Sequence, residues 1–260
     1  MSAVRPADVA ALVLAAGQGT RMNSDLAKVL HPMCGEPMLA HVLAALDETG
    51  VDRILVVIGH QRDRVREAFP RPGIEWVVQA EQRGTGHAVQ MAAPALGDFS
   101  GTLLVVCGDT PLLRGATLRA LLAHHAAGGA AATVLSTRVP EPRGYGRIVR
   151  DAARGRVAIV EERDAAPKQR SIDEINSGIF AFRYPVLRTV LGRLTTENAQ
   201  GEYYLTDTLS LIQDAGYPAG ALCAEDWREL LGINTPEQLA EVERIHRGRR
   251  GGLGPGPGPR

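Results

Sequence analysis

The chain has 260 residues, of which 45% are hydrophobic. This composition is typical of a globular protein with a substantial core and excludes a mostly disordered one. Its 29 basic residues are balanced by 29 acidic residues, so the formal net charge is zero. Without a basic excess there is no global field that would favour nucleic acid or an anionic membrane as a partner. Any attraction for a phosphorylated substrate must therefore come from a local site.

The cysteines and the first apolar run both indicate a cytoplasmic protein. Cys34, Cys107 and Cys223 are far apart and form no CxxC pair, so we interpret them as small buried residues in a reducing compartment. Residues 9–16 loosely resemble a signal peptide, but Asp8 precedes them and a glycine-rich loop follows in place of a cleavage site. The run is also too short to span a bilayer, and it predicts a buried first strand.

In the first half of the chain, short apolar runs alternate with helical patterns. Strands are expected at residues 9–15, 53–58, 75–78 and 102–107, and helices at 37–47, 63–69, 86–95 and 117–125. This alternation predicts βαβ crossovers and a mostly parallel sheet. The near-continuous apolar character of the strands predicts that helices cover both faces of that sheet.

The pattern changes after Gly129, where strands follow one another without long helices between them. Strands are expected at residues 131–137, 146–149, 157–161 and 175–182, and later helices at 184–191, 203–213 and 236–245. We therefore expect an antiparallel extension packed against the first sheet. From Arg247 onward the composition is mainly arginine, glycine and proline, which predicts one folded domain over residues 1–246 and a disordered tail over 247–260.

A glycine-rich loop, LAAGQGTRM at residues 14–22, follows the first strand. Gly17 and Gly19 permit backbone conformations that other residues avoid, and the N–H groups of such a loop can cradle phosphates. Arg21 offers bidentate contact to phosphate oxygens, and Lys28 offers a mobile point charge. The spacing fits neither a P-loop nor a Rossmann dinucleotide site. A simple tight turn is the alternative, but open α/β sheets bind ligands at this end of their strands.

Polar residues also follow the third strand. Gln79 ends that strand, and Gln82, Gly84 and Thr85 come next. A glutamine amide can read the donor and acceptor edge of a pyrimidine, and the residues after it can bring backbone groups close to the base. The alternative is a polar turn in which Thr85 caps the following helix.

Two further residues are candidate ligands for Mg²⁺. Asp109 lies just beyond the fourth strand in CGDTP, and Asn234 lies just before the last helix in GINTP. Mg²⁺ prefers few carboxylates and retains substrate oxygens and waters. The alternatives are that Asp109 caps a turn bent by Pro111, and that Asn234 or Thr235 is a helix N-cap.

Several later motifs carry side chains that can hydrogen-bond sugar hydroxyls and an N-acyl group. They are GYGR at residues 144–147, Glu161, EINSG at 174–178 and GEYYLTD at 201–207. Surface turns use the same residue types, which is the alternative. We expect a positioning or structural role for His87 and a helix-surface location for the pair His124 and His125.

Taken in order, nine motifs resemble the pyrophosphorylase domain of the N-acetylglucosamine-1-phosphate uridyltransferase family. They are LAAGQGTRM, AKVLHP, QAEQRGTGHA, CGDTPLL, GYGRI, VEERDA, EINSGIFAF, GEYYLTD and GINTPEQL, and they extend over roughly residues 9–245. The resemblance implies an α/β, Rossmann-like nucleotidyltransferase fold with an antiparallel extension for the sugar site. It also implies Mg²⁺ as cofactor, UTP and N-acetylglucosamine 1-phosphate as substrates, and UDP-N-acetylglucosamine and pyrophosphate as products.

The resemblance assigns roles to individual residues of this chain. Arg21 and Lys28 would be catalytic, and Asp109 and Asn234 would bind Mg²⁺. The implied nucleotide-binding residues are Leu14, Ala15, Ala16, Gly17, Gly19, Gln79, Gln82, Gly84, Thr85, Cys107 and Gly108. The implied sugar-binding residues are Gly146, Glu161 and Asn176.

The sequence departs from the family pattern at three points. Ala27 replaces the usual proline before Lys28, and Cys107 replaces the usual tyrosine before Gly108. The β-helix that usually carries acetyltransferase activity does not follow within these residues. We therefore expect no acetyl transfer by this chain, no inherited trimer, and a separate acetyltransferase as a candidate partner.

The implied reaction is an in-line attack by the sugar phosphate on the α-phosphorus of UTP. The nucleophile is already anionic and needs no catalytic base, so alignment and charge stabilisation would supply the catalysis. Two alternatives remain open: the same chemistry with another nucleotide and phosphate, and a non-catalytic sensor of sugar nucleotides.

Overall fold

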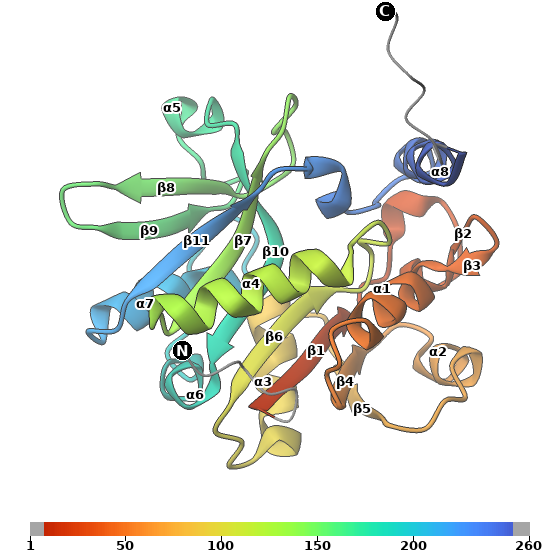
Figure 1. The fold of residues 1–260 in the computed structure, drawn as a ribbon, viewed down its shortest axis with the longest axis horizontal. Helices are drawn as coiled ribbons and strands as arrows, with labels where there is room; N and C mark the ends of the chain where they lie inside the picture. Colours follow the sequence, from red (N-terminus) through yellow and green to blue (C-terminus); the bar gives the residue numbers. More distant parts are fainter. Residues whose placement is uncertain (1–7, 252–260) are drawn as a thin grey trace, which may run out of the picture.

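The computed structural model describes residues 8–251, and its centre is a mixed nine-stranded sheet. Seven strands follow the order β11-β7-β10-β6-β1-β4-β5, and β8 and β9 extend from β10 (Figure 1). The strands are β1 (Val9–Ala15), β4 (Arg53–Ile58), β5 (Ile74–Val78), β6 (Thr102–Cys107), β7 (Ala132–Arg138), β8 (Arg147–Asp151), β9 (Arg156–Val160), β10 (Glu174–Arg183) and β11 (Ala219–Ala224). The apolar run that follows Asp8 is thus the buried strand β1, as predicted.

The directions of the strands confirm a mostly parallel sheet with antiparallel additions. Strands β6, β1, β4 and β5 are parallel to one another, with Leu12 of β1 opposite Leu55 and Val105. Strand β10 is antiparallel to β6, β7 and β8, and β8 is antiparallel to β9. The sequence did not predict β11, which is parallel to β7. Its sequence AGALCA is rich in residues of low strand propensity, so main-chain pairing with β7 determines its conformation.

Eight α-helices and four short 3₁₀ turns complete the described chain, together with a two-stranded ribbon of β2 (Pro32–Met33) and β3 (Glu36–Pro37). The α-helices are α1 (Met38–Asp47), α2 (Arg62–Ala68), α3 (Thr85–Leu96), α4 (Gly115–Gly128), α5 (Pro167–Arg170), α6 (Tyr184–Leu191), α7 (Thr208–Asp214) and α8 (Pro236–Gly251). The 3₁₀ turns are η2 (Thr20–Met22), η3 (Lys28–Leu30), η4 (Leu205–Asp207) and η5 (Trp227–Leu230). Within residues 8–251, every helix is too short or too polar to cross a membrane.

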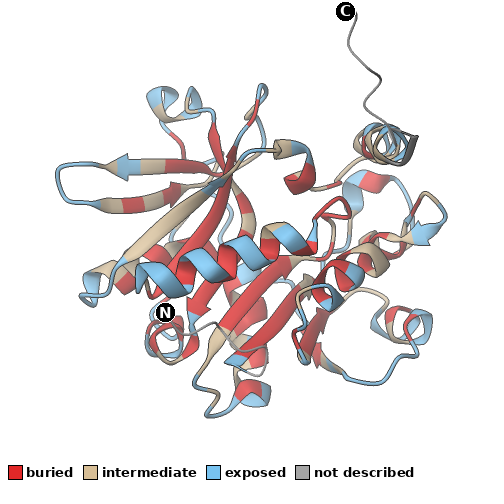
Figure 2. Ribbon diagram, in the orientation of Figure 1, coloured by how far each residue is buried: buried red, intermediate tan, exposed pale blue. Residues whose placement is uncertain are grey.

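Helices cover both faces of the sheet, as the apolar strands predicted. Because side chains alternate along a strand, Ala10 and Leu12 of β1 contribute to one core, with α3, α6 and α7. Ala11 and Val13 contribute to the opposite core, with α1 and α4. Figure 1 shows α1 and α4 in front of the sheet, and Figure 2 shows buried strands beneath the exposed outer face of α4.

Two predicted helices have different limits in the structure. The helix expected at residues 203–213 is replaced by η4 and α7, because Tyr203 has non-helical partners. Its N–H donates to the Arg83 carbonyl at 2.9 Å, and its own carbonyl accepts from Gly86 at 2.8 Å. Helix α8 continues past residue 246, and Arg249 donates to Asp226 at 2.7 Å. The folded part therefore extends beyond the predicted start of the tail, whose residues 252–260 lie outside the described range.

The solvent exposure of His125 and of Cys223 differs from what the sequence predicted. His125 is 5% exposed, not on the helix surface, and its Nδ1 lies 2.8 Å from the Thr133 hydroxyl. Burial is the main cause that lowers the pKa of His125 to about 4. His124 is exposed as expected. Cys223 is exposed as well, because it lies on strand β11, at the end of the seven-strand order.

Candidate active site

Two cavities meet at the carboxyl ends of β1 and β6. The first has a volume of about 300 Å³, and its wall includes Leu14, Ala15, Ala16, Gly17, Lys28, Gln79, Gln82, Gly84 and Thr85. The second has a volume of about 330 Å³, and its wall includes Arg21, Gly146, Glu161, Asn176 and Asn234. The two cavities share Leu14, Thr85, Cys107 and Asp109. A ligand in the first cavity can therefore reach a ligand in the second beside Asp109.

Two predicted site residues, Gly19 and Gly108, line neither cavity but shape the junction between them. Gly19 has a φ of 69°, and a Cβ placed there would lie 2.8 Å from the Cβ of Lys28. The Gly108 N–H donates to the Leu14 carbonyl at 2.9 Å, which ties the ends of β6 and β1 together. Glycine at these positions therefore acts through geometry and close packing, with no side chain to touch a ligand.

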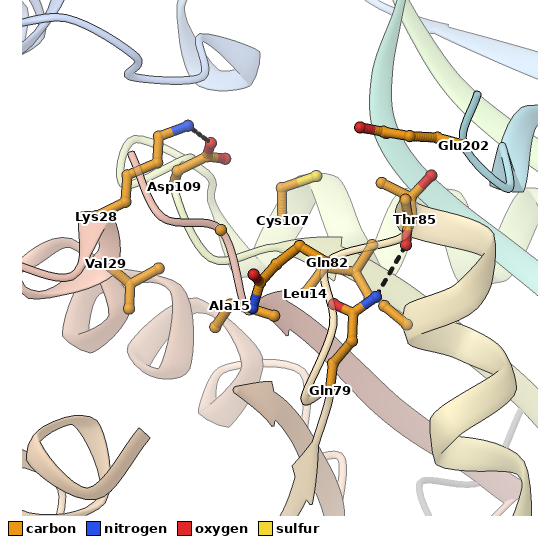
Figure 3. Close-up of a pocket in the computed structure, with 14 residues that line it drawn as sticks. Leu14, Ala15, Lys28, Val29, Gln79, Gln82, Thr85, Cys107, Asp109 and Glu202 are labelled. Atoms are coloured by element: carbon orange, nitrogen blue, oxygen red, sulfur yellow. Dashed lines mark hydrogen bonds and ion pairs between the residues drawn. The ribbon is translucent and has the colours of Figure 1, made fainter. Parts of the chain in front are cut away.

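A cluster of two cations and two oxygen-bearing side chains occupies the junction. The Lys28 ammonium donates to the Asp109 carboxylate (Figure 3). It also donates to the Asn234 amide oxygen at 2.7 Å. A guanidinium nitrogen of Arg21 donates to the same amide oxygen at 2.8 Å. The side chains of Lys28 and Asp109 are only 13% and 23% exposed, so the pair is weakly screened by solvent.

Of the capping alternatives, the structure confirms the N-cap at Thr235 and not one at Asn234, and the Asp109 carboxylate bonds to Lys28 instead of capping a turn. Thr235 caps helix α8: its hydroxyl accepts from the Gln238 N–H at 3.3 Å, and the Gln238 side chain accepts from the Thr235 N–H at 3.2 Å. This reciprocal pair is a capping box, and it leaves the side chain of Asn234 directed into the cluster. The Asp109 carboxylate contacts Lys28, while the Asp109 carbonyl accepts from Ile233 at 3.0 Å.

The Gln79 side chain is held in one orientation at the base of the first cavity. It is 3% exposed, and its amide nitrogen donates to the Gly84 carbonyl at 3.1 Å and lies 3.1 Å from Nδ1 of His87. Thr85 does not cap helix α3, because its hydroxyl accepts from the Leu205 N–H at 3.1 Å. The contact of His87 with Gln79 agrees with the positioning or structural role expected of His87. Figure 3 shows Gln79 beneath the cavity.

In the second cavity, two predicted side chains present oxygen atoms. Glu161 accepts from the Thr206 hydroxyl at 3.1 Å. Burial raises the pKa of Glu161, the Thr206 hydrogen bond opposes this rise, and the nearby Asp207 adds to it. The side-chain oxygen of Asn176 accepts from the Gly178 N–H at 2.9 Å, and the pairing of β10 with β7 is irregular at this point.

Cys107 lies where the two cavities meet, but its chemistry is that of a neutral thiol. Burial and the nearby Asp109 raise the pKa of Cys107 to about 12, and its sulfur lies 3.5 Å from the Gly178 carbonyl. Because the thiolate is the nucleophilic form, the raised pKa argues against a covalent role. Gly178 has a φ of 78°, and a Cβ there would lie 2.7 Å from the sulfur, so these two residues pack closely.

Sequence reasoning did not single out Tyr145, Glu202 and Thr206, although each lies in a motif that it had noted. Tyr145 and Thr206 line the second cavity, and Glu202 lines the first, opposite Lys28 in Figure 3. Their position within GYGR and GEYYLTD was the available signal. The described residues contain no group of three or more His, Cys, Asp and Glu side chains that could hold a metal. A metal here would therefore depend on few carboxylates together with amide and substrate oxygens.

Comparison with known proteins agrees with this geometry. Residues 11–174 match the MobA-like NTP transferase domain. The bifunctional protein GlmU of Streptomyces avermitilis is 53% identical over 249 residues, that of Thermobifida fusca 52% over 251, and that of Pelobacter propionicus 50% over 243. These alignments cover 94%, 94% and 93% of this chain but only 51%, 51% and 53% of the relatives.

The chain thus spans about half the length of the curated relatives that it matches. The family match extends over more than half of the chain and contains the loop after β1, the Gln79 segment, Asp109 and Glu161. On this basis the chain belongs to the MobA-like NTP transferase domain family.

Proposed function

We propose that this chain transfers a uridylyl group from UTP to N-acetylglucosamine 1-phosphate, giving UDP-N-acetylglucosamine and pyrophosphate. One observation carries the proposal: two cavities meet beside Asp109, with Lys28 and Arg21 at the junction. Two anionic substrates that must react with each other need adjoining sites and positive charge between them. The GlmU relatives support the assignment of UTP and an amino-sugar phosphate through the family resemblance.

The orientation of Gln79 supports uracil as the base. Its amide nitrogen is engaged by Gly84 and His87, so its amide oxygen is the group left to face a ligand. An acceptor at this position matches the N3–H of uracil, whereas N3 of cytosine carries no hydrogen. Because a buried polar group left unpaired costs about 1–3 kcal/mol, this contact favours UTP over CTP.

The second cavity supports a sugar as acceptor. Glu161 and Asn176 offer oxygens, and a larger residue at Gly146 would crowd the Glu161 carboxylate, because a Cβ there would lie 3.0 Å from Ile159 and 3.2 Å from Glu161. A carboxylate and an amide are suited to hydroxyl and N-acyl groups, which donate and accept hydrogen bonds. The wall of the second cavity carries more of these hydrogen-bonding groups than cationic side chains. We therefore place the sugar ring of the acceptor in this cavity, with its phosphate toward Arg21.

The donor set at the junction fits Mg²⁺. The Asp109 carboxylate and the Asn234 amide converge from distant parts of the chain on a single cation, the Lys28 ammonium. These hard oxygen ligands would hold Mg²⁺ together with phosphate oxygens. Bound there, Mg²⁺ would supply neutralisation of charge on the triphosphate.

The residues of the chain would align the reactants and stabilise charge. The loop at residues 14–17 would hold the triphosphate through its backbone N–H groups. Arg21 and Lys28 would balance the charge that develops as the acceptor phosphate attacks the α-phosphorus and pyrophosphate leaves in line. No residue needs to remove a proton, since the attacking phosphate oxygen is already anionic, and the neutral Cys107 is consistent with this.

The proposal includes a cellular location and a limit on the chemistry. The described cysteines are all free, and UTP is an intracellular substrate, so we place the chain in the cytoplasm. The proposal is limited to nucleotidyl transfer.

The test is pyrophosphate release by the purified full chain with Mg²⁺, across a panel of nucleoside triphosphates and sugar phosphates. We expect release with UTP and N-acetylglucosamine 1-phosphate and little with other pairs. Release only with a different pair would keep the reaction and replace the substrates. Binding of UDP-N-acetylglucosamine with no release from any pair would overturn the transferase and favour a sugar-nucleotide sensor.

A further inference from the structure

The two side chains that would hold the metal are already paired with a cation of the chain itself. The ammonium of Lys28 bonds to the Asp109 carboxylate and to the Asn234 amide oxygen. Arg21 donates to that same amide oxygen. A divalent ion approaching these oxygens alone would meet two positive charges at hydrogen-bonding distance from its ligands, and like charges this close repel strongly where solvent screening is weak.

Packing and hydrogen bonds hold the backbone around Lys28, whereas its side chain has rotatable bonds that allow the ammonium to change partners. Residue 27 is held by a hydrogen bond of 2.9 Å from the Ala27 N–H to the Gln61 side chain. The close packing of Gly19 against the Lys28 Cβ fixes where the side chain leaves the loop. Beyond that point, a flexible four-carbon stem carries an ammonium with three rotatable donors. The ammonium can therefore move between partners without any change in the loop.

The amino-acid composition supports a mobile charge at this position. Of the 29 basic residues in the chain, only Lys28 and Lys168 are lysines. Lys168 is exposed on the short helix α5, where lysine and arginine are interchangeable in solvent. Arginine at residue 28 would present a rigid fork that binds a carboxylate bidentately. A lysine ammonium can leave the Asp109 carboxylate more easily when phosphate oxygens compete for it.

We propose that Lys28 is a displaceable occupant of the metal-binding oxygens, so that the chain takes up its metal together with the nucleotide and not before it. The triphosphate draws the Lys28 ammonium away from Asp109 and Asn234, and those oxygens then become available to the metal. This inference rests on the proposed function, since it assigns the first cavity to a nucleoside triphosphate. It gives Lys28 a role in the order of binding in addition to charge stabilisation.

The direct test is binding of Mn²⁺ to the full chain without nucleotide, measured from the paramagnetic resonance signal of free Mn²⁺. We expect weak binding by the wild type and binding tighter by at least about tenfold in Lys28→Met, because the variant removes a unit charge within contact of the ligands. Lys168→Met is the matched control and should bind as the wild type does. Asp109→Asn added to Lys28→Met should abolish the gain. Equal affinities of the wild type and Lys28→Met, or a gain that survives Asp109→Asn, would overturn the proposal.

A second measurement needs no substitution. Reductive methylation with ¹³C keeps the charge of both lysines and gives each a distinct resonance, with Lys168 as the internal reference. Addition of UTP without metal should shift the Lys28 resonance and leave that of Lys168 in place. An unchanged Lys28 resonance at a UTP concentration that calorimetry shows to be saturating would refute the displacement. Neither measurement requires turnover, so failure of pyrophosphate release would leave both results interpretable.

Discussion

Thr206 is expected to keep Glu161 ionised for sugar binding, and replacing it by valine tests this. Burial and the nearby carboxylates raise the pKa of Glu161, and the Thr206 hydroxyl is the group that opposes this rise. Thr206→Val conserves volume but removes the donor at 3.1 Å. The pKa of Glu161 should then rise further, so the carboxyl stays protonated up to a higher pH and fewer chains offer the sugar an ionised acceptor on the acidic side of the profile.

The magnitude follows from the type of bond. A hydrogen bond to a charged group contributes about 1.5–3 kcal/mol, and the lower figure applies because Glu161 is only half-buried. About 1.5 kcal/mol corresponds to roughly a tenfold change in the protonation equilibrium of Glu161, so KM for the sugar phosphate should rise by up to about tenfold on the acidic side of the pH profile. The assay is initial-rate kinetics with the sugar phosphate varied at saturating UTP. The KM for UTP should stay within about twofold, because Glu161 does not line the first cavity.

The pH profile separates a positioning role from a loss of stability. The acidic limb of kcat/KM for the sugar phosphate reports ionisation of the free enzyme, and in Thr206→Val it should move to higher pH. Thr206→Ser retains the hydroxyl and should behave as the wild type. An acidic limb at the same pH in Thr206→Val and Thr206→Ser would show that the reasoning about Glu161 is wrong.

Three further outcomes are expected. Lys28→Ala should lower kcat by about 10²–10³, as loss of a transition-state stabiliser does, and turnover near that of the wild type would exclude the role. Gly84→Ala should weaken UTP binding by about tenfold or more in calorimetry, because residue 84 has a φ of 102° and the new Cβ would lie 2.6 Å from the Tyr203 carbonyl. The pKa of His125 is lowered to about 4, so the unfolded chain binds more protons between about pH 6.5 and 4 and stability falls as pH drops through this window, by on the order of 3 kcal/mol. In His125→Gln, the free energy of unfolding from urea titrations should differ less between pH 7 and pH 5 than it does in the wild type. An equal difference in both proteins would contradict the prediction.

Much of the fold was predictable because its elements have strong local patterns. The strands β1, β4 and β6 are apolar apart from the first residues of β4 and β6, and their limits agree with those expected from the sequence. Strand β11 was not predictable, since its sequence lacks β-branched residues and depends on main-chain pairing with β7. The first turn of the helix expected at residues 203–213 was also mispredicted, because hydrogen bonds of Tyr203 to Arg83 and Gly86 override its helical pattern.

The candidate site was predictable where it consists of strand ends. The residues after β1, β5 and β6 had to share one edge of the sheet, because parallel strands end on the same side. What the sequence could not give is the contact of Lys28 with both Asp109 and Asn234, which are separated from it by 81 and 206 positions. Nor could it show that Thr206 bonds to Glu161, because that contact depends on the non-helical path before η4.

The position of Asn234 depends on packing that lies outside both cavities. Met22 and Ile233 belong to one apolar cluster, in which Val242 of helix α8 also packs. Met22 directly follows Arg21, and Ile233 directly precedes Asn234, so this cluster sets the distance between the guanidinium and the amide oxygen. The bond of Arg249 to Asp226 holds the end of the same helix. Because close-packed interiors transmit strain, the alignment of Asn234 with Asp109 depends on how α8 packs against this cluster. The last helix, including the part past residue 246, is therefore a structural component of the metal-binding junction.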